Sequence, residues 1–182
     1  LQAWQLFTQD AEAVRRLWVV ALGTLAFSME DVLLEPYGGE ILRLSVASTT
    51  QLTATLAMGS LIGFATASRL LSRGADPFRM AGAGCVCGLP AFMLVVGAAY
   101  APEPAVCFSA GTFLIGLGAG LFGHGTLTAT MNRASKEQAG LAMGAWGAAQ
   151  ATAAGLAMAL GGILRDVVAT ISSAWTGYCF VY

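Results

Sequence analysis

The feature that most constrains this chain is a series of six apolar runs. Five of them are long enough to cross the hydrocarbon layer of a bilayer as helices. The runs cover residues 17–34, 48–71, 79–99, 105–131, 138–164 and 174 onward. A helix needs about 20 apolar residues to cross that layer, so we expect the sixth run to be incomplete and the chain to be part of a longer protein. The pattern predicts an all-α polytopic membrane protein, with residues 1–16 as a lead-in and residues 17–182 as the membrane domain.

Composition supports this class and argues against two others. Hydrophobic residues make up 57% of the chain and charged residues only 10%, and the mean hydropathy is +0.70. Soluble domains carry about a quarter charged residues. The formal net charge is −1, so there is no basic excess of the kind that binds nucleic acid. We therefore expect a lipid bilayer as the surroundings and no nucleic-acid partner.

The basic residues predict an orientation. Seven of the nine lie near the start of the chain, around the link between the second and third runs, or in the link between the fourth and fifth runs: Arg15, Arg16, Arg69, Arg73, Arg79, Arg133 and Lys136. The other two, Arg43 and Arg165, fall on the opposite side. Because cytoplasmic loops carry an excess of Lys and Arg, we expect the N-terminal end and the basic link with Arg69, Arg73 and Arg79 to be cytoplasmic. Those arginines also suit an anchoring role at lipid headgroups.

An acidic stretch ends the first apolar run. It contains Glu30, Asp31 and Glu35, and Pro36 follows as the residue expected to end the helix. On a continuous helix, Asp31 and Glu35 would share one face with Phe27. Two interpretations stay open: a solvated acidic end among headgroups, or a cluster facing the bundle that meets a partner, a substrate or a proton.

His124, the only histidine, lies inside the fourth run between Gly123 and Gly125. An imidazole buried in lipid needs a partner. It either donates a hydrogen bond to a neighbouring helix or ligates the metal of a tetrapyrrole through a ring nitrogen. Helical side chains lean toward the N-terminus, so a ligated ring would lie over Gly120, where a glycine is expected to leave room.

Glycines also recur at four-residue spacing along the runs. The pairs we assign to helix packing include Gly59 with Gly63, Gly116 with Gly120, and Gly140 with Gly144. In lipid, close backbone approach supplies packing energy between helices. An alternative is that some of these glycines make room for a bulky flat ligand or for sliding helices.

Nothing in the sequence indicates catalysis. A single histidine without a placed nucleophile does not make a hydrolase, and the phosphate-loop pattern GxxxxGK[ST] is absent from the sequence. We expect no enzyme, no catalytic residue and no metal site formed directly by side chains.

Three segments carry a family resemblance. Residues 27–39, with the run Glu-Asp-Val-Leu-Leu-Glu-Pro-Tyr-Gly, residues 116–128 and residues 138–150 are similar to motifs of the PucC/LhaA group, the bacteriochlorophyll-delivery branch of the major facilitator superfamily. The resemblance covers nearly the whole chain. It implies the six-helix C-terminal half of a twelve-helix bundle, with its last helix truncated.

The resemblance also implies a function. Such a protein helps bacteriochlorophyll reach light-harvesting alpha and beta polypeptides, or helps them assemble around the reaction centre, in the bacterial photosynthetic intracytoplasmic membrane. His124 and Gly120 are the expected pigment contacts, with the magnesium of bacteriochlorophyll on the imidazole; a carotenoid or lipid is a further candidate ligand. The acidic motif would stabilise the outer end or meet a partner. The rivals are a secondary transporter of a small solute and a structural subunit of a photosynthetic complex.

Overall fold

The computed structural model describes residues 10–135 and 137–182, and these residues form helices and connecting turns. Lys136 and the first nine residues of the lead-in lie outside them. The elements in chain order are α2 (Ala11–Ser28), α3 (Leu34–Glu40), α4 (Val46–Ser72), α5 (Pro77–Gly97), η1 (Ala98–Tyr100), α6 (Pro104–Arg133), α7 (Ala139–Ile171) and α8 (Ala174–Val181). The predicted all-α fold is confirmed for the described residues.

Four of these helices, α4 to α7, are long and apolar enough to cross a membrane, with α5 counted through η1. They coincide with the second to fifth predicted runs. Their starts follow local rules. Proline occupies the first turn of α5 and of α6, where no intrahelical N–H is needed, and the Asp76 carboxylate accepts the Arg79 N–H of α5 at 2.8 Å.

Helices α4, α5 and α6 form one tightly packed unit, with α6 between its neighbours. Glycine backbones make the contacts. A Cβ placed on Gly63 of α4 would lie 2.5 Å from the Leu117 carbonyl oxygen of α6, and a Cβ on Gly84 of α5 would lie 2.5 Å from the Gly118 carbonyl oxygen. Side chains larger than hydrogen would push these helices apart, so glycine sets their spacing.

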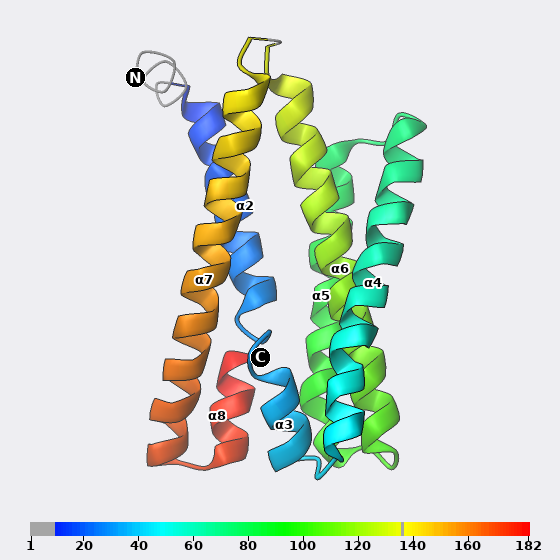
Figure 1. Cartoon of the computed structure of the whole chain (residues 1–182), viewed down its shortest axis with the longest axis vertical. Coiled ribbons are helices and arrows are strands. Elements are labelled where there is room, and N and C mark those ends of the chain that lie inside the picture. Colours follow the sequence, from blue (N-terminus) through cyan, green and yellow to red (C-terminus); the bar gives the residue numbers. More distant parts are fainter. Residues whose placement is uncertain (1–9, 136) are drawn as a thin grey trace.

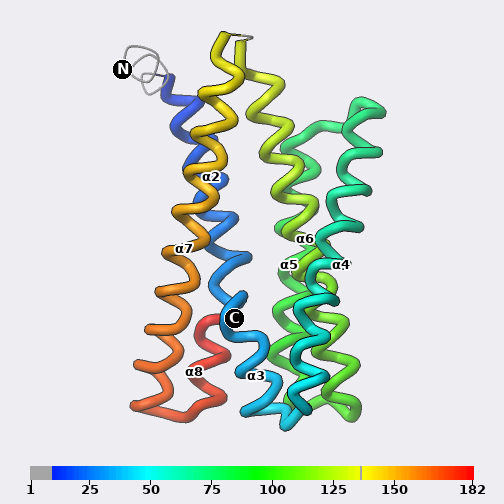
Figure 2. Tube along the Cα trace, viewed as in Figure 1, coloured from blue at the N-terminus to red at the C-terminus, as the bar shows by residue number. Residues whose placement is uncertain are grey.

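The first predicted span is not one helix, which corrects the expectation of a continuous run over 17–34. Helix α2 ends at Ser28 and α3 begins at Leu34 (Figure 2). The apolar part of α2 from Leu17 onward is about 18 Å long at 1.5 Å per residue, too short for a ~30 Å hydrocarbon layer. Pro36 does not end a helix: it lies in the first turn of α3, where its missing N–H costs nothing.

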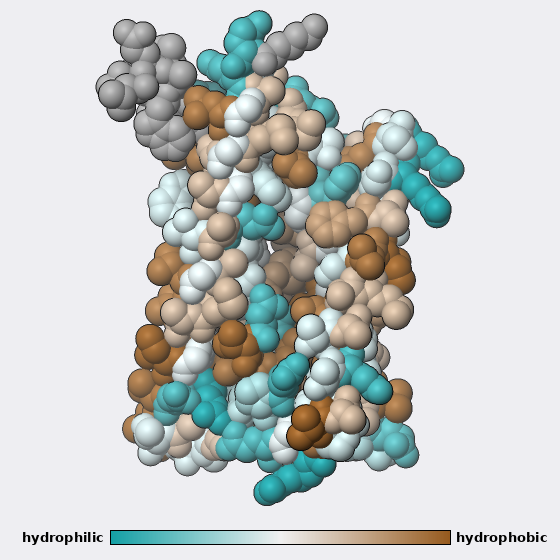
Figure 3. Space-filling view, in the orientation of Figure 1, coloured by the Kyte–Doolittle hydropathy of each residue, from teal (hydrophilic) through white to brown (hydrophobic). Residues whose placement is uncertain are grey.

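The links that carry most of the basic residues lie at the same end of the molecule as the start of α2 (Figure 1). The start of α2, the α4–α5 link and the α6–α7 link lie at one end of the molecule, and α3 lies at the other end with the last turns of α7 (Figure 1). Hydrophilic residues gather mainly toward the two ends, and apolar or pale residues dominate the flank between them (Figure 3). The described helices thus form a multi-pass membrane domain with two polar ends.

Candidate functional site

The break between α2 and α3 divides the acidic motif. Glu30 is buried, with 1% of its surface exposed, and neither carboxylate oxygen has a hydrogen-bond partner among the described residues. Asp31 and Glu35 are exposed, and Glu35 accepts a hydrogen bond from the Thr53 hydroxyl at 3.0 Å. The prediction that Asp31 and Glu35 share a helix face with Phe27 is wrong. The helix ends between Phe27 and Asp31, and Phe27 is buried.

At the far end of the domain, an ionic and aromatic network joins α3, α7 and α8. Arg165 pairs with Glu40 and with Asp166. The Tyr178 hydroxyl donates to Glu40 Oε2 at 2.8 Å, and the Arg165 guanidinium lies 4.5 Å from the centroid of the Tyr178 ring. Tyr37, fully buried, packs its ring edge-on against Tyr178 at 5.2 Å between centroids. This network holds the short helix α3 against its neighbours.

The space predicted to be open over Gly120, beside His124, is filled. The imidazole packs edge-on against Phe64 of α4, with 5.8 Å between ring centroids. A Cβ on Gly120 would lie 2.5 Å from the Ser60 carbonyl oxygen and 3.1 Å from Gly63 Cα. The backbone of α4 therefore fills the space that Gly120 was expected to leave open. The prediction that a macrocycle lies over Gly120 is wrong.

The two flanking glycines behave differently from each other. Gly125 packs against the start of α5, since a Cβ there would lie 2.8 Å from the Pro77 carbonyl oxygen. A Cβ placed on Gly123 would lie 3.9 Å from the nearest carbon of the Phe64 ring, which is ordinary contact. Gly125 therefore serves helix packing, and only Gly123 borders the same aromatic ring as His124.

The glycine pairs fall into two groups. Gly59, Gly63 and Gly116 make the close α4–α6 approach that was predicted. Gly140 and Gly144 do not: a Cβ on either would meet no atom within 4 Å among the described residues. No described helix packs closely against these two glycines, and the small-residue face of α7 is open.

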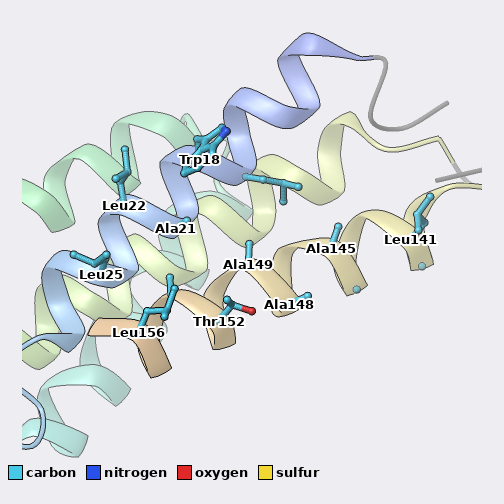
Figure 4. A pocket seen from close by; sticks show the side chains of 14 residues that line it. Trp18, Ala21, Leu22, Leu25, Leu141, Ala145, Ala148, Ala149, Thr152 and Leu156 are labelled. Atoms are coloured by element: carbon cyan, nitrogen blue, oxygen red, sulfur yellow. The ribbon is translucent and has the colours of Figure 1, made fainter. Parts of the chain in front are cut away.

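That open face forms one wall of a groove between α2 and α7, with a volume of about 700 Å³ (Figure 4). The α2 side is lined by Leu17, Trp18, Ala21, Leu22 and Leu25. The α7 side is lined by Gly140, Leu141, Gly144, Ala145, Ala148, Ala149, Thr152, Ala153 and Leu156. No histidine or carboxylate lines the groove. Its volume is typical of small-molecule sites, and its chemistry suits a hydrocarbon ligand without metal coordination.

Sequence reasoning did not single out this groove, although a signal was present. The face of α7 that borders it carries glycine and alanine where a lipid-facing helix ordinarily carries Leu, Ile or Val. Small residues fit a packing face as well as a ligand groove, so only the position of α2 shows which of the two this face forms.

The predicted basic link is exposed. Arg69, Arg73 and Arg79 all lie at the surface and make no ion pair with the described residues.

Comparisons with known proteins agree with the sequence motifs. The profile of the PUCC protein family matches residues 1–182. Protein PucC of Rhodovulum sulfidophilum is 58% identical, with 97% of this chain and 40% of the relative aligned. Protein PucC of Cereibacter sphaeroides is 56% identical, with 91% of this chain and 36% of the relative aligned.

A more distant relative is the Bacteriochlorophyll synthase 44.5 kDa chain of Rhodobacter capsulatus. It is 29% identical, over 86% of this chain and 40% of its own length. No solved structure matches the chain. The chain spans about two fifths of the length of the curated relatives that it matches. On the match over its full length and the identity to two PucC proteins, the chain belongs to the PUCC protein family.

Proposed function

We propose that this chain is the membrane domain of a light-harvesting complex assembly factor that carries bacteriochlorophyll as cargo. The observation that carries the proposal is the apolar groove between α2 and α7, which opens toward the surroundings and has a volume of about 700 Å³. Family membership and the printed name of the Rhodobacter capsulatus relative support bacteriochlorophyll as the cargo.

The groove matches the hydrocarbon part of such a pigment. Its lining offers one hydroxyl, from Thr152, and the indole of Trp18 at the rim. Burying apolar surface of a ligand releases roughly 25 cal/mol per Å², and this term needs no metal ligand. The pigment tail would lie along the small residues of α7, while the magnesium would be ligated by a partner or by another part of the full protein.

The proposed partners are the light-harvesting polypeptides and the reaction-centre complex, in the photosynthetic intracytoplasmic membrane, with the basic links on the cytoplasmic side. The exposed small residues Gly140 and Gly144 also permit a close approach by another transmembrane helix. The role is carriage and assembly, and it requires no reacting side chain.

A matched pair of substitutions tests the groove. Gly144→Trp places an indole in the groove, and Gly155→Trp makes the same change on α7 at a second open glycine outside the groove lining. We expect the full-length Gly144→Trp protein to lose most of its copurified bacteriochlorophyll, measured by absorbance per mole of protein, while Gly155→Trp retains it. Equal pigment in both variants would contradict the groove.

The same preparations separate the rival functions. Uptake of a small solute into vesicles without bound pigment would favour a secondary transporter. A fixed stoichiometry with mature photosynthetic complexes would favour a structural subunit, because an assembly factor leaves the finished complex.

A further inference from the structure

The break between α2 and α3 places one carboxyl group in the interior of the domain. The Glu30 side chain is 1% exposed, and the backbone around it is fixed. The N–H groups of Leu33 and Leu34 both donate to the Glu30 carbonyl, at 2.8 and 3.1 Å. The Met29 carbonyl lies so close to Gly161 of α7 that no Cβ would fit there. Helix α7 therefore covers the break.

The described ionisable groups close to Glu30 are an acid and a phenol, and neither carries a positive charge. Asp31 follows it in the chain and interacts with it as a second acid. Tyr182, directly after α8, lies near Glu30. Its own neighbours include Tyr37, whose ring centroid is 5.4 Å from that of Tyr182, and Tyr178 and Cys179. The hydroxyl of Tyr182 is itself buried without a partner among the described residues.

The basic residue of α7 forms its ion pairs with other acids. Arg165 pairs with Glu40 and Asp166 at the polar end of the domain, and no ion pair joins a described basic residue to Glu30. The described residues also contain no group of three or more His, Cys, Asp or Glu side chains placed to hold a metal ion. Among the described residues, neither a basic side chain nor a metal-binding cluster is placed to neutralise this carboxylate.

Burial strongly disfavours an unpaired carboxylate, so in practice such a group binds a proton and becomes neutral. We infer that Glu30 is a proton-binding site: its carboxyl group is a neutral acid while the break is closed, and it releases the proton only when the break opens to water. The non-helical residues between α2 and α3 are where the two helix segments can change their angle. The proton would thus be linked to the conformation of the first span.

This inference does not depend on the pigment groove, and infrared spectroscopy tests it. The full-length protein is reconstituted in lipid nanodiscs at neutral pH, and the C=O stretch of neutral carboxylic acids is recorded in H₂O and D₂O. We expect a band that shifts in D₂O and disappears in Glu30→Gln. The matched control Glu35→Gln, at an exposed carboxylate of the same motif, should leave the band unchanged.

Two results would overturn the inference. The first is an unchanged spectrum in Glu30→Gln, which would show that Glu30 is ionised at neutral pH. The second is failure of Glu30→Gln to insert and fold, judged by far-ultraviolet circular dichroism. Glutamine has the size of the neutral acid and carries no charge, so a site that is protonated when folded should tolerate it.

Discussion

Substitution of Gly120 by alanine tests whether the α4–α6 interface is as close as the structure shows. The new methyl carbon would lie 2.5 Å from the Ser60 carbonyl oxygen and 3.1 Å from Phe64 N. It would have to move outward by 0.5 Å to reach 3.0 Å and by 0.9 Å to reach ordinary van der Waals contact at 3.4 Å. The opposing atoms belong to helical backbone, so the helices themselves must separate.

The expected cost follows from that separation. A radial gap of 0.5–1 Å forfeits about a quarter to a half of each dispersion contact, and overpacking of a close interface costs about 1–3 kcal/mol. Gly144→Ala is the matched control, because a Cβ there meets no described atom within 4 Å. Both variants replace glycine by alanine within a helix, a change that stabilises an ordinary helix by about 0.5–1 kcal/mol, so their difference isolates the steric cost.

The assay is unfolding of the full-length protein in mixed micelles, followed by circular dichroism during titration with a denaturing detergent. We expect the free energy of unfolding of Gly120→Ala to fall about 1–3 kcal/mol below that of Gly144→Ala. Equal values for the two variants would refute the close approach of α4 to Gly120. They would also restore the space beside His124 that a flat ligand would need.

Three further predictions concern the polar ends and the histidine. Arg165→Met should lower the unfolding free energy by about 0.5–1 kcal/mol, because it leaves the half-exposed Glu40 carboxylate without its cation; an unchanged or higher value in the same titration would contradict this. His124→Leu should leave the copurified pigment-to-protein ratio unchanged, and a clear drop in absorbance would reinstate the imidazole as a ligand. In a background without the four native cysteines, Gly39→Cys should react with an impermeant thiol reagent from outside and Ala75→Cys only after permeabilisation. The reverse pattern would invert the orientation.

Much of the helical order was predictable because it depends on local chemistry. The length of the apolar runs alone located α4 to α7. Pro77 and Pro104 occupy the first turns of α5 and α6, a position that proline favours in any helix. The charge pattern grouped the ends correctly. Pro36 shows the limit of local rules, because the same residue can end one helix or occupy the first turn of the next.

The candidate sites were less predictable, because each depends on which surface a neighbouring helix covers. Gly120 and Gly144 are each the second glycine of a pair at four-residue spacing. Helix α4 covers Gly120, whereas Gly144 borders the open groove. Glu30 and Glu35 lie in one acidic motif, yet the first is buried and the second is exposed.

The sequence by itself determined that this chain forms a multi-pass membrane domain and where the spanning helices α4 to α7 lie, because hydrophobic length is a property of a single segment. Only the tertiary structure decided that the first span is broken, that Glu30 faces inward and that α7 leaves an open groove. Those outcomes depend on contacts between segments distant in the chain, and no single segment carries information about the partner that will cover it.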